Sequence, residues 1–193
     1  MSGTVKPWVT VVGAGPAGLL LALLLSQKGV PVLVLDSAEE LDNRPRATHY
    51  GPPAMYELER AGVAEQVRNE GFLPAAVCWR KLTGPPLAFI DSTLMSEDPN
   101  RLACLPLNSL GKILLARLLL QPNAEIKWSH KVVAIGQDDK KAWVEVETPN
   151  GSQKLESSYI VGCDGANSQI RRSLFGDWNF PGKTWDEQIV ATN

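Results

Sequence analysis

The hydrophobic pattern at the start of the chain predicts a strand, a helix and a second strand. Trp8 to Val12 is a short, mostly apolar and β-branched run, which is typical of a strand buried on both faces of a parallel sheet. Ala17 to Lys28 has the length and composition of a helix, and Gly29 ends it. Pro31 to Leu35 is apolar again. These residues therefore predict one βαβ unit with a right-handed crossover.

The middle of the chain mixes helical and strand patterns. Two short helices are expected from Ala54 to Ala61 and from Val63 to Glu70, because a glycine separates them. Apolar runs on both sides of the turn Thr83-Gly-Pro-Pro predict a hairpin between Leu73 and Asp91. Apolar residues at helical spacing from Asn108 to Leu120 predict a longer helix.

Alternation of apolar and polar residues dominates from Glu125 to Ser158. Its short stretches, separated by turn sequences, predict a small meander of three antiparallel strands, with Asn150-Gly151 as a two-residue hairpin turn. Tyr159 to Cys163 then predicts a buried strand, and a helix is expected from about Asn167 to Leu174. The last ten residues, TWDEQIVATN, have the pattern of the start of another strand.

Composition and charge exclude several classes of partner. The chain is 44% hydrophobic and 21% charged, as expected for a soluble globular protein. Its 19 basic and 21 acidic residues are scattered, so neither a nucleic acid nor a membrane surface is an expected partner. The longest apolar run, Leu19 to Leu25, is too short to span a bilayer.

The cysteines favour a reducing compartment. Cys78, Cys104 and Cys163 are widely spaced and form no CxxC pair, so neither a disulfide framework nor a zinc site is indicated. The residues suggest no other metal site and no nucleophile with its base. We therefore expect a cytoplasmic protein without a metal, and we assign no catalytic residue.

The sequence GAGPAG after the first strand predicts a nucleotide cradle. Gly13 allows a sharp turn, Gly15 lets the backbone approach a pyrophosphate, and Gly18 allows close packing of the helix on the strand. The helix that begins near Pro16 and Ala17 offers unsatisfied N–H groups and a positive dipole end to the phosphates. A structural turn without a ligand is the alternative, but the strand, the helix and a following acid all match a nucleotide site.

Asp36, at the end of the second strand, and the neighbouring Ser37 are candidates for the ribose of an adenosine. The alternative for Asp36 is a carboxylate that caps the next turn. An acid at this position repels a 2′-phosphate, so this site should reject NADP. Arg44 and Arg46 follow in a loop, where they could reach the ribose or phosphates or form surface salt bridges.

A second candidate feature is the sequence DGANS after the last predicted strand. Gly165 permits a tight strand-to-helix turn, and Ser168 or Asn167 can cap the helix. A capped turn alone does not explain why this turn also carries Asp164 and two arginines, Arg171 and Arg172. By contrast, His49 and His130, the two histidines, are more simply interpreted as solvated residues than as catalytic ones.

Taken together, these motifs resemble those of the FAD-dependent aromatic hydroxylases, the single-component flavoprotein monooxygenases of the para-hydroxybenzoate hydroxylase and phenol hydroxylase type. The resemblance rests on VVGAGPAGLLLALLL with Asp36, on RPRA at 44–47 and on CDGANSQIRRSL at 163–174. It implies that Asp164 and Gly165 serve both flavin and nicotinamide, that Ser168 and Arg171 match family residues, and that Arg46 touches the FAD.

The resemblance also implies a fold, cofactors and partners. The fold would be α/β, with a Rossmann-like FAD/NAD(P)-binding domain that has a parallel sheet and an antiparallel three-stranded meander, plus the beginning of a β-rich substrate domain. Residues 1–73 and 104–175 would form the FAD-binding domain, and residues 74–103 and 176–193 would be segments of an incomplete substrate domain. FAD would be the cofactor, NADPH or NADH the reductant, and an aromatic small molecule and oxygen the other reactants.

The sequence departs from the family pattern at three places. Asp36 stands where Glu is more common, Leu107 follows Pro106 where many members have a Gln, and the family's third flavin motif would lie beyond residue 193. We therefore expect the N-terminal part of a monooxygenase, which would associate through exposed apolar surface or with a missing C-terminal half. A truncated flavin-binding or partner-binding module and a nicotinamide-dependent dehydrogenase are the alternatives.

Overall fold

A computed structural model describes residues 7–44, 48–177, 182–183 and 185–188. Its contacts divide the chain into two compact units, Met1–Arg44 with Leu114–Asn193 and Pro45–Ile113, which we call unit 1 and unit 2. The division concerns packing, so the functional domain boundaries expected from the sequence stay a prediction.

A four-stranded parallel sheet is the centre of unit 1. Its strand order is β11-β1-β2-β7, and every neighbouring pair is parallel. The strands and the crossover helix are β1 (Val9–Val12), α1 (Pro16–Gln27), β2 (Val32–Leu35), β7 (Ala124–Lys127) and β11 (Tyr159–Gly162). All residues of β1 and β2 are buried, which confirms the predicted βαβ unit.

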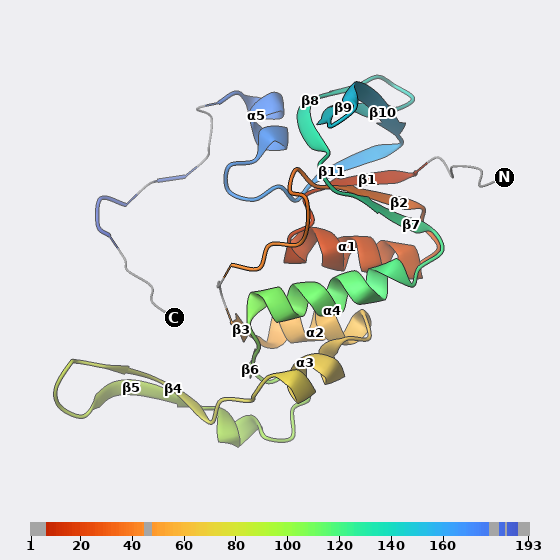
Figure 1. Cartoon of the computed structure of the whole chain (residues 1–193). Helices are drawn as coiled ribbons and strands as arrows, with labels where there is room; N and C mark the ends of the chain where they lie inside the picture. Colours follow the sequence, from red (N-terminus) through yellow and green to blue (C-terminus); the bar gives the residue numbers. More distant parts are fainter. Residues whose placement is uncertain (1–6, 45–47, 178–181, 184, 189–193) are drawn as a thin grey trace. The chain divides into compact units, whose positions relative to one another are not determined.

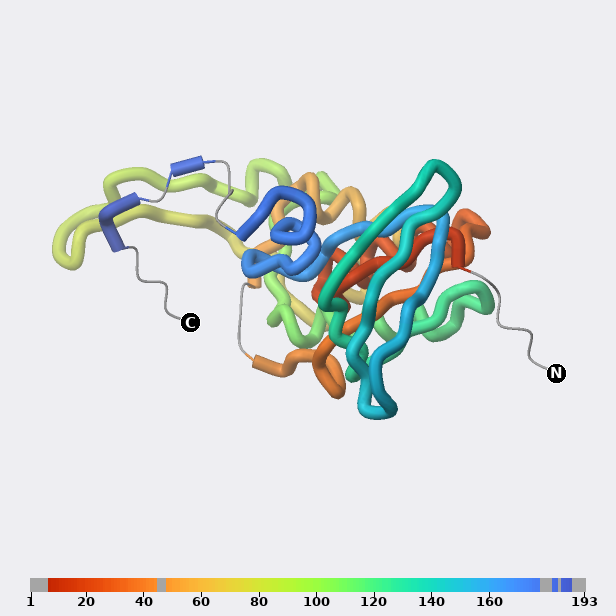
Figure 2. The backbone as a smooth tube through the Cα atoms, turned by 90° about the horizontal axis from the view of Figure 1, so that it is seen from above, coloured from red at the N-terminus to blue at the C-terminus, as the bar shows by residue number. Residues whose placement is uncertain are grey.

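Two layers cover this sheet. Helix α1 lies on one face and a three-stranded antiparallel sheet lies on the other (Figure 1). Seen from above, the antiparallel strands run across β1 and β2 (Figure 2). Those strands are β8 (Lys131–Gln137), β9 (Ala142–Thr148) and β10 (Gly151–Ser157). The core between the two sheets contains Val12, Leu33, Leu35, Val132, Val144, Val146 and Ile170.

The predicted meander is confirmed, with two differences in detail. The stretch around Ile126 belongs to β7, which pairs in parallel with β2 and not with the meander. The turn between β9 and β10 consists of Pro149 and Asn150, since Gly151 already pairs with Thr148. Gly151 has a φ of +108°, which a glycine adopts without strain, so the expected Asn150-Gly151 turn was wrong by one position.

Unit 1 ends with helix α5 (Gln169–Phe175), close to the expected position. Of the strand expected in the last ten residues, only residues 185–188 are described, and they form no strand; residues 184 and 189–193 lie outside the described part of the chain.

Unit 2 contains short helices and two pairs of strands. The elements are β3 (His49–Tyr50), α2 (Pro52–Arg60), α3 (Ala64–Glu70), β4 (Ala76–Arg80), β5 (Pro86–Asp91), the short 3₁₀ helix η1 (Ser92–Met95) and β6 (Ala103–Cys104). Strand β3 pairs with β6, and β4 pairs with β5. Helix α4 (Leu107–Leu119) follows; it begins in unit 2, and its residues from Leu114 on belong to unit 1. The two short helices, the hairpin and the longer helix all confirm the sequence prediction.

Candidate cofactor site

Three loops that carry the sequence motifs leave the same edge of the parallel sheet. The glycine-rich loop follows β1, Asp36 follows β2 and Asp164 follows β11. Strand β1 lies between β2 and β11, and all three strands run in one direction. Their carboxyl ends therefore meet, which is where open α/β sheets bind ligands. The structure brings both sequence motifs into one site.

Gly13 and Gly18 are needed for the packing of the protein backbone, whether or not a ligand binds. Gly13 has a φ of +106°, and a Cβ there would overlap the carbonyl of Cys163. A Cβ on Gly18 would overlap the carbonyl oxygen of Gly13. Both glycines therefore allow close backbone packing, as the spacing of the motif predicts. The contact of Gly13 with Cys163 also places the glycine-rich loop directly against the turn at Asp164.

Gly15 has a different environment, because no atom lies within 4 Å of the position that its Cβ would occupy. It is the N-cap of α1, with Pro16 at the start of the helix, and no side chain caps the helix N–H groups. The first turn carries no acidic residue, and Pro16 and Ala17 are exposed. The open space beside uncapped N–H groups fits a pyrophosphate.

Asp36 connects its own loop to the glycine-rich loop. Its Oδ2 accepts a hydrogen bond of 2.6 Å from the backbone N–H of Ala14, and its Oδ1 accepts one of 2.8 Å from the N–H of Ala38. The hydrogen bond from Ala38 caps the turn after β2, which is the alternative role that the sequence suggested for Asp36. This double role does not exhaust the carboxylate. It leaves further lone pairs for a ribose hydroxyl, since an ionised carboxylate has about four acceptor sites. Ser37 is exposed beside it.

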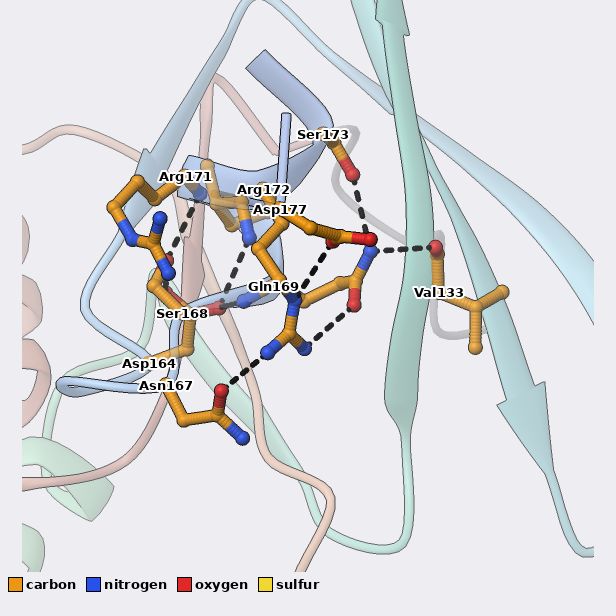
Figure 3. A network of polar contacts seen from close by, with 10 residues as sticks. Val133, Asp164, Asn167, Ser168, Gln169, Arg171, Arg172, Ser173 and Asp177 are labelled. Carbon is orange, nitrogen blue, oxygen red and sulfur yellow. Dashed lines mark hydrogen bonds and ion pairs between the residues drawn. The ribbon is translucent and has the colours of Figure 1, made fainter. Parts of the chain in front are cut away.

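Asp164 organises the start of α5. Its Oδ1 accepts a hydrogen bond of 2.6 Å from the hydroxyl of Ser168, and its Oδ2 accepts from the backbone N–H groups of Gln169 (2.7 Å) and Ile170 (3.1 Å). Ser168 is the N-cap and accepts from the N–H of Arg171, which confirms its capping role (Figure 3). Gly165 has a φ of +81°, as a tight turn requires.

A polar network on α5, which the sequence analysis missed, surrounds Arg172 (Figure 3). Its guanidinium donates to the side-chain oxygens of Asn167 and Gln169, and its Nε lies 3.8 Å from Asp177. Gln169 also donates to the carbonyl of Val133 at 3.2 Å, which connects α5 to β8. The positions of Gln169 and Arg172, three residues apart on one helix, were the available signal.

The other candidate cations occupy different environments. Arg44 is 75% exposed and forms an ion pair with Asp42, whose hydrogen bond and charge raise the pKa of the guanidinium. This is the surface salt bridge considered as the alternative for Arg44. Arg46 lies outside the described residues. The Nε and Nη1 atoms of Arg171 are buried beside the turn at Asp164.

The histidines and Cys163 form no nucleophilic centre in the described structure. His49 lies in β3 of unit 2 with its Nδ1 2.9 Å from Thr48, while the Nδ1 of His130 lies 2.6 Å from the carbonyl oxygen of Trp128. Burial raises the pKa of the half-buried Cys163 thiol, and the neighbouring charge of Asp164 raises it further. The thiol is therefore protonated at neutral pH and acts as a packing residue.

The described residues offer neither a metal site nor a membrane-spanning helix. They contain no group of three or more His, Cys, Asp or Glu side chains placed to hold a metal ion. None of their helices is both long enough and apolar enough to cross a membrane.

Comparison with known proteins identifies the family. A family model described as FAD binding domain matches residues 6–191. Para-nitrophenol 4-monooxygenase of Pseudomonas sp. (strain WBC-3) is 34% identical over 187 residues, which are 96% of this chain and 46% of that protein. The chain therefore belongs to the FAD binding domain family of the FAD-dependent aromatic hydroxylases.

Solved structures agree with this assignment. The crystal structure of p-nitrophenol 4-monooxygenase from Pseudomonas putida matches with a TM-score of 0.82 and 34% identity, over 87% of this chain and 43% of that one. A ternary complex of aklavinone-11 hydroxylase with FAD and aklavinone matches with a TM-score of 0.76 and 28% identity, over 90% and 35% of the two chains. The chain spans about half the length of the curated relatives it matches.

Proposed function

We propose that this chain forms the FAD-binding part of an NAD(P)H-dependent flavoprotein monooxygenase that hydroxylates an aromatic or similarly activated small molecule. The observation that carries the proposal is the open position of Gly15 at the uncapped N-terminus of α1. A protein that used GAGPAG only as a turn would need Gly13 and Gly18 for packing, but it would not need a glycine at position 15.

Different residues of the site would bind different parts of the FAD. The N–H groups of Gly15, Ala17 and Gly18 would hold the pyrophosphate, and Asp36 with Ser37 would hold the adenosine ribose. Arg44 and Arg46 are proposed from the sequence for the same end of the cofactor. Asp164 and Gly165 lie in the turn that packs against the glycine-rich loop, and Ser168 and Arg171 lie at the start of α5; we assign all four to the flavin and nicotinamide side.

Bound FAD would supply the redox and oxygen chemistry after reduction by NADPH or NADH, while the protein binds, orients and excludes water. The named relative acts on p-nitrophenol, and the aklavinone-11 hydroxylase structure contains FAD together with aklavinone. We extend this only to an aromatic substrate and oxygen. The cytoplasmic location expected from the cysteine pattern stays a prediction.

A flavin-binding or partner-binding module without hydroxylase activity is the second candidate function. Both candidates require FAD to bind, so the first experiment tests this step. Bleaching of the bound flavin by NADPH or NADH without oxygen would then favour the monooxygenase.

The test compares wild type with Gly15→Ala. Gly15 has a φ of −67° and no atom near its Cβ position, so alanine should fit the free protein without strain. The added methyl would instead block the approach of the pyrophosphate. We expect FAD affinity to fall roughly tenfold or more, since overpacking costs about 1–3 kcal/mol. The measurement is the flavin spectrum during titration and after gel filtration.

Gly13→Ala is the contrasting variant. It places a Cβ at a φ of +106° and against the carbonyl of Cys163, so its melting temperature should fall together with its FAD affinity. The melting temperature of Gly15→Ala should stay at the wild-type value. A wild-type chain that retains no FAD, or a Gly15→Ala variant that retains it as well as wild type, would contradict the proposal.

A further inference from the structure

We propose that Ser129 is a positioning residue for FAD, which holds the carboxylate of Asp36 in place through the turn of residues 128–130. We call this segment the β7–β8 turn. The inference deepens the proposed function and rests on it, because it takes Asp36 as the residue that binds the adenosine ribose. No motif in the sequence pointed to this turn.

The β7–β8 turn continues the pairing of β2 and β7 beyond the end of both strands. The N–H of Asp36 donates to the carbonyl of Lys127 at 3.0 Å, and the carbonyl of Asp36 accepts from the N–H of His130 at 2.8 Å. The N–H of Ser129 donates to the carbonyl of Ala38 at 2.7 Å. Both backbone polar groups of Asp36 are therefore bonded to the segment that leaves β7.

The carboxylate of Asp36 is held by two other backbone N–H groups. Its Oδ2 accepts from the N–H of Ala14 in the glycine-rich loop, and its Oδ1 accepts from the N–H of Ala38. The backbone of Asp36 thus belongs to the ladder with the β7–β8 turn, and its side chain belongs to the pyrophosphate loop. A shift of the turn would move the carboxylate relative to the N–H groups that are proposed to hold the pyrophosphate.

Ser129 adopts an unusual backbone conformation in the β7–β8 turn. Its φ of 54° makes it the one non-glycine residue with a positive φ among the described residues. L-residues enter this left-handed region at a cost, and β-branched residues are genuine outliers there. The His130 ring beside it has its Nδ1 2.6 Å from the carbonyl oxygen of Trp128, which closes the turn locally.

The short side chain of Asp36 explains why such support matters. An aspartate carboxylate is separated from the backbone by one methylene and has only two side-chain torsions, so the backbone largely sets where it lies. A binding carboxylate must be placed within about 0.5 Å to keep its hydrogen bonds to a ligand. The ladder at Asp36 supplies this restraint from outside the two recognised motifs.

The test compares Ser129→Val with Ser129→Asn in the whole chain. Valine is β-branched and should force the turn out of the left-handed conformation, whereas asparagine tolerates it. We expect Ser129→Val to weaken FAD binding roughly tenfold, because residues coupled in one network show interaction free energies of about 0.5–3 kcal/mol. Ser129→Asn should restore wild-type affinity, and Ser152→Val on the exposed strand β10 should leave it unchanged.

A double-mutant cycle separates positioning from general destabilisation. If Ser129 acts through Asp36, Ser129→Val should weaken FAD binding in wild type but change it less than about twofold in an Asp36→Ala background. An equal loss of affinity in both backgrounds would overturn the positioning role.

A second measurement needs no flavin. Amide hydrogen exchange at Ala14, whose N–H is bonded to Asp36, should accelerate in Ser129→Val and in Asp36→Ala but not in Ser129→Asn. Unchanged protection of the Ala14 amide in Ser129→Val would overturn the inference about Ser129 but not the proposed function. A wild-type chain that binds no FAD would overturn the proposed function, and with it the role of Ser129 in positioning Asp36 for FAD.

Discussion

Tyr50 shows how one buried side chain sets a pH limit on unit 2. Its hydroxyl donates to the carbonyl of Leu105 at 2.9 Å. Burial, together with a smaller effect of nearby Cys104, raises the pKa of Tyr50 from 10.0 to about 12. Because the folded-state value is the higher one, the contribution of Tyr50 to stability is complete below pH 10 and is lost as the pH rises towards 12.

The corresponding variant is Tyr50→Phe. At neutral pH it should lower the free energy of unfolding by about 1 kcal/mol, the usual net value of one neutral hydrogen bond. Between pH 10 and 12 the difference between wild type and Tyr50→Phe should shrink, as followed by urea unfolding at each pH. Tyr56→Phe, at an exposed tyrosine of α2, controls for the other groups that titrate in this range. A difference that stays constant up to pH 12 would contradict the assignment.

Single residues also show what the sequence could and could not predict. The roles of Gly13, Gly15 and Gly18 follow from their spacing after an apolar strand, and the structure gives each glycine a different environment. The bond from Ala14 to Asp36 joins residues 22 positions apart and depends on the pairing of β1 with β2. No local pattern encodes that contact, so the bond by which Asp36 connects two loops appeared only in the fold, whereas its turn-capping role was already an alternative from the sequence.

At the scale of elements, α5 depends on the acid of its preceding turn. Asp164 accepts three hydrogen bonds at the start of this seven-residue helix. Asp164→Ala should therefore destabilise the protein by about 1–2 kcal/mol even without ligand, as the loss of a helix cap does. Asp177→Ala is the matched control, because this carboxylate is exposed and its ion pair with Arg172 is long, at 3.8 Å. Its removal should therefore have little effect on the free energy of unfolding. Equal unfolding free energies of Asp164→Ala and wild type in urea would show that the cap contributes nothing.

This expectation affects how binding experiments are interpreted. A loss of FAD by an Asp164 variant would combine a weaker α5 with any lost contact to the cofactor. The effect on unfolding without FAD measures the first part, and the difference between the two measurements gives the second.

Elements whose partners are close in sequence were predicted best. The βαβ unit, the two short helices, the hairpin and the meander all follow from local periodicity and turn residues. The stretch around Ile126 was predicted as part of the antiparallel meander region, but it forms β7, which pairs in parallel with β2, about 90 residues earlier in the chain. Periodicity identifies a strand, but it carries no information on which distant strand will be its neighbour.

For the whole molecule, the hairpin of β4 and β5 is the feature that a stable monomer would not expose. Cys78 pairs with Phe89 and Trp79 pairs with Ala88, so Phe89 and Trp79 point to opposite faces of the two-stranded sheet. Phe89 is 65% exposed and Leu87 on the same face 66%, while Trp79 is 53% and Ile90 on its face 58% exposed. Apolar residues on both faces are typical of strands buried inside a larger sheet.

We expect this hairpin to make the isolated chain associate. Curated relatives are about twice as long, so a protein of their length has further polypeptide that could cover the hairpin. In the chain alone, the outer edges of β4 and β5 and their apolar faces remain available to another copy. Light scattering after gel filtration should therefore show a mean mass that rises with protein concentration.

The variant Trp79→Thr with Phe89→Thr removes the largest apolar side chain from each face and keeps residues that favour strands. It should remain monomeric at concentrations where wild type associates, and its affinity for FAD should match that of monomeric wild type. Tyr56→Ala, which removes an equally exposed aromatic from α2, should associate like wild type. A wild type that is monomeric at every concentration would contradict the expected association. A double variant that associates as strongly as wild type would show that a surface other than the hairpin drives it.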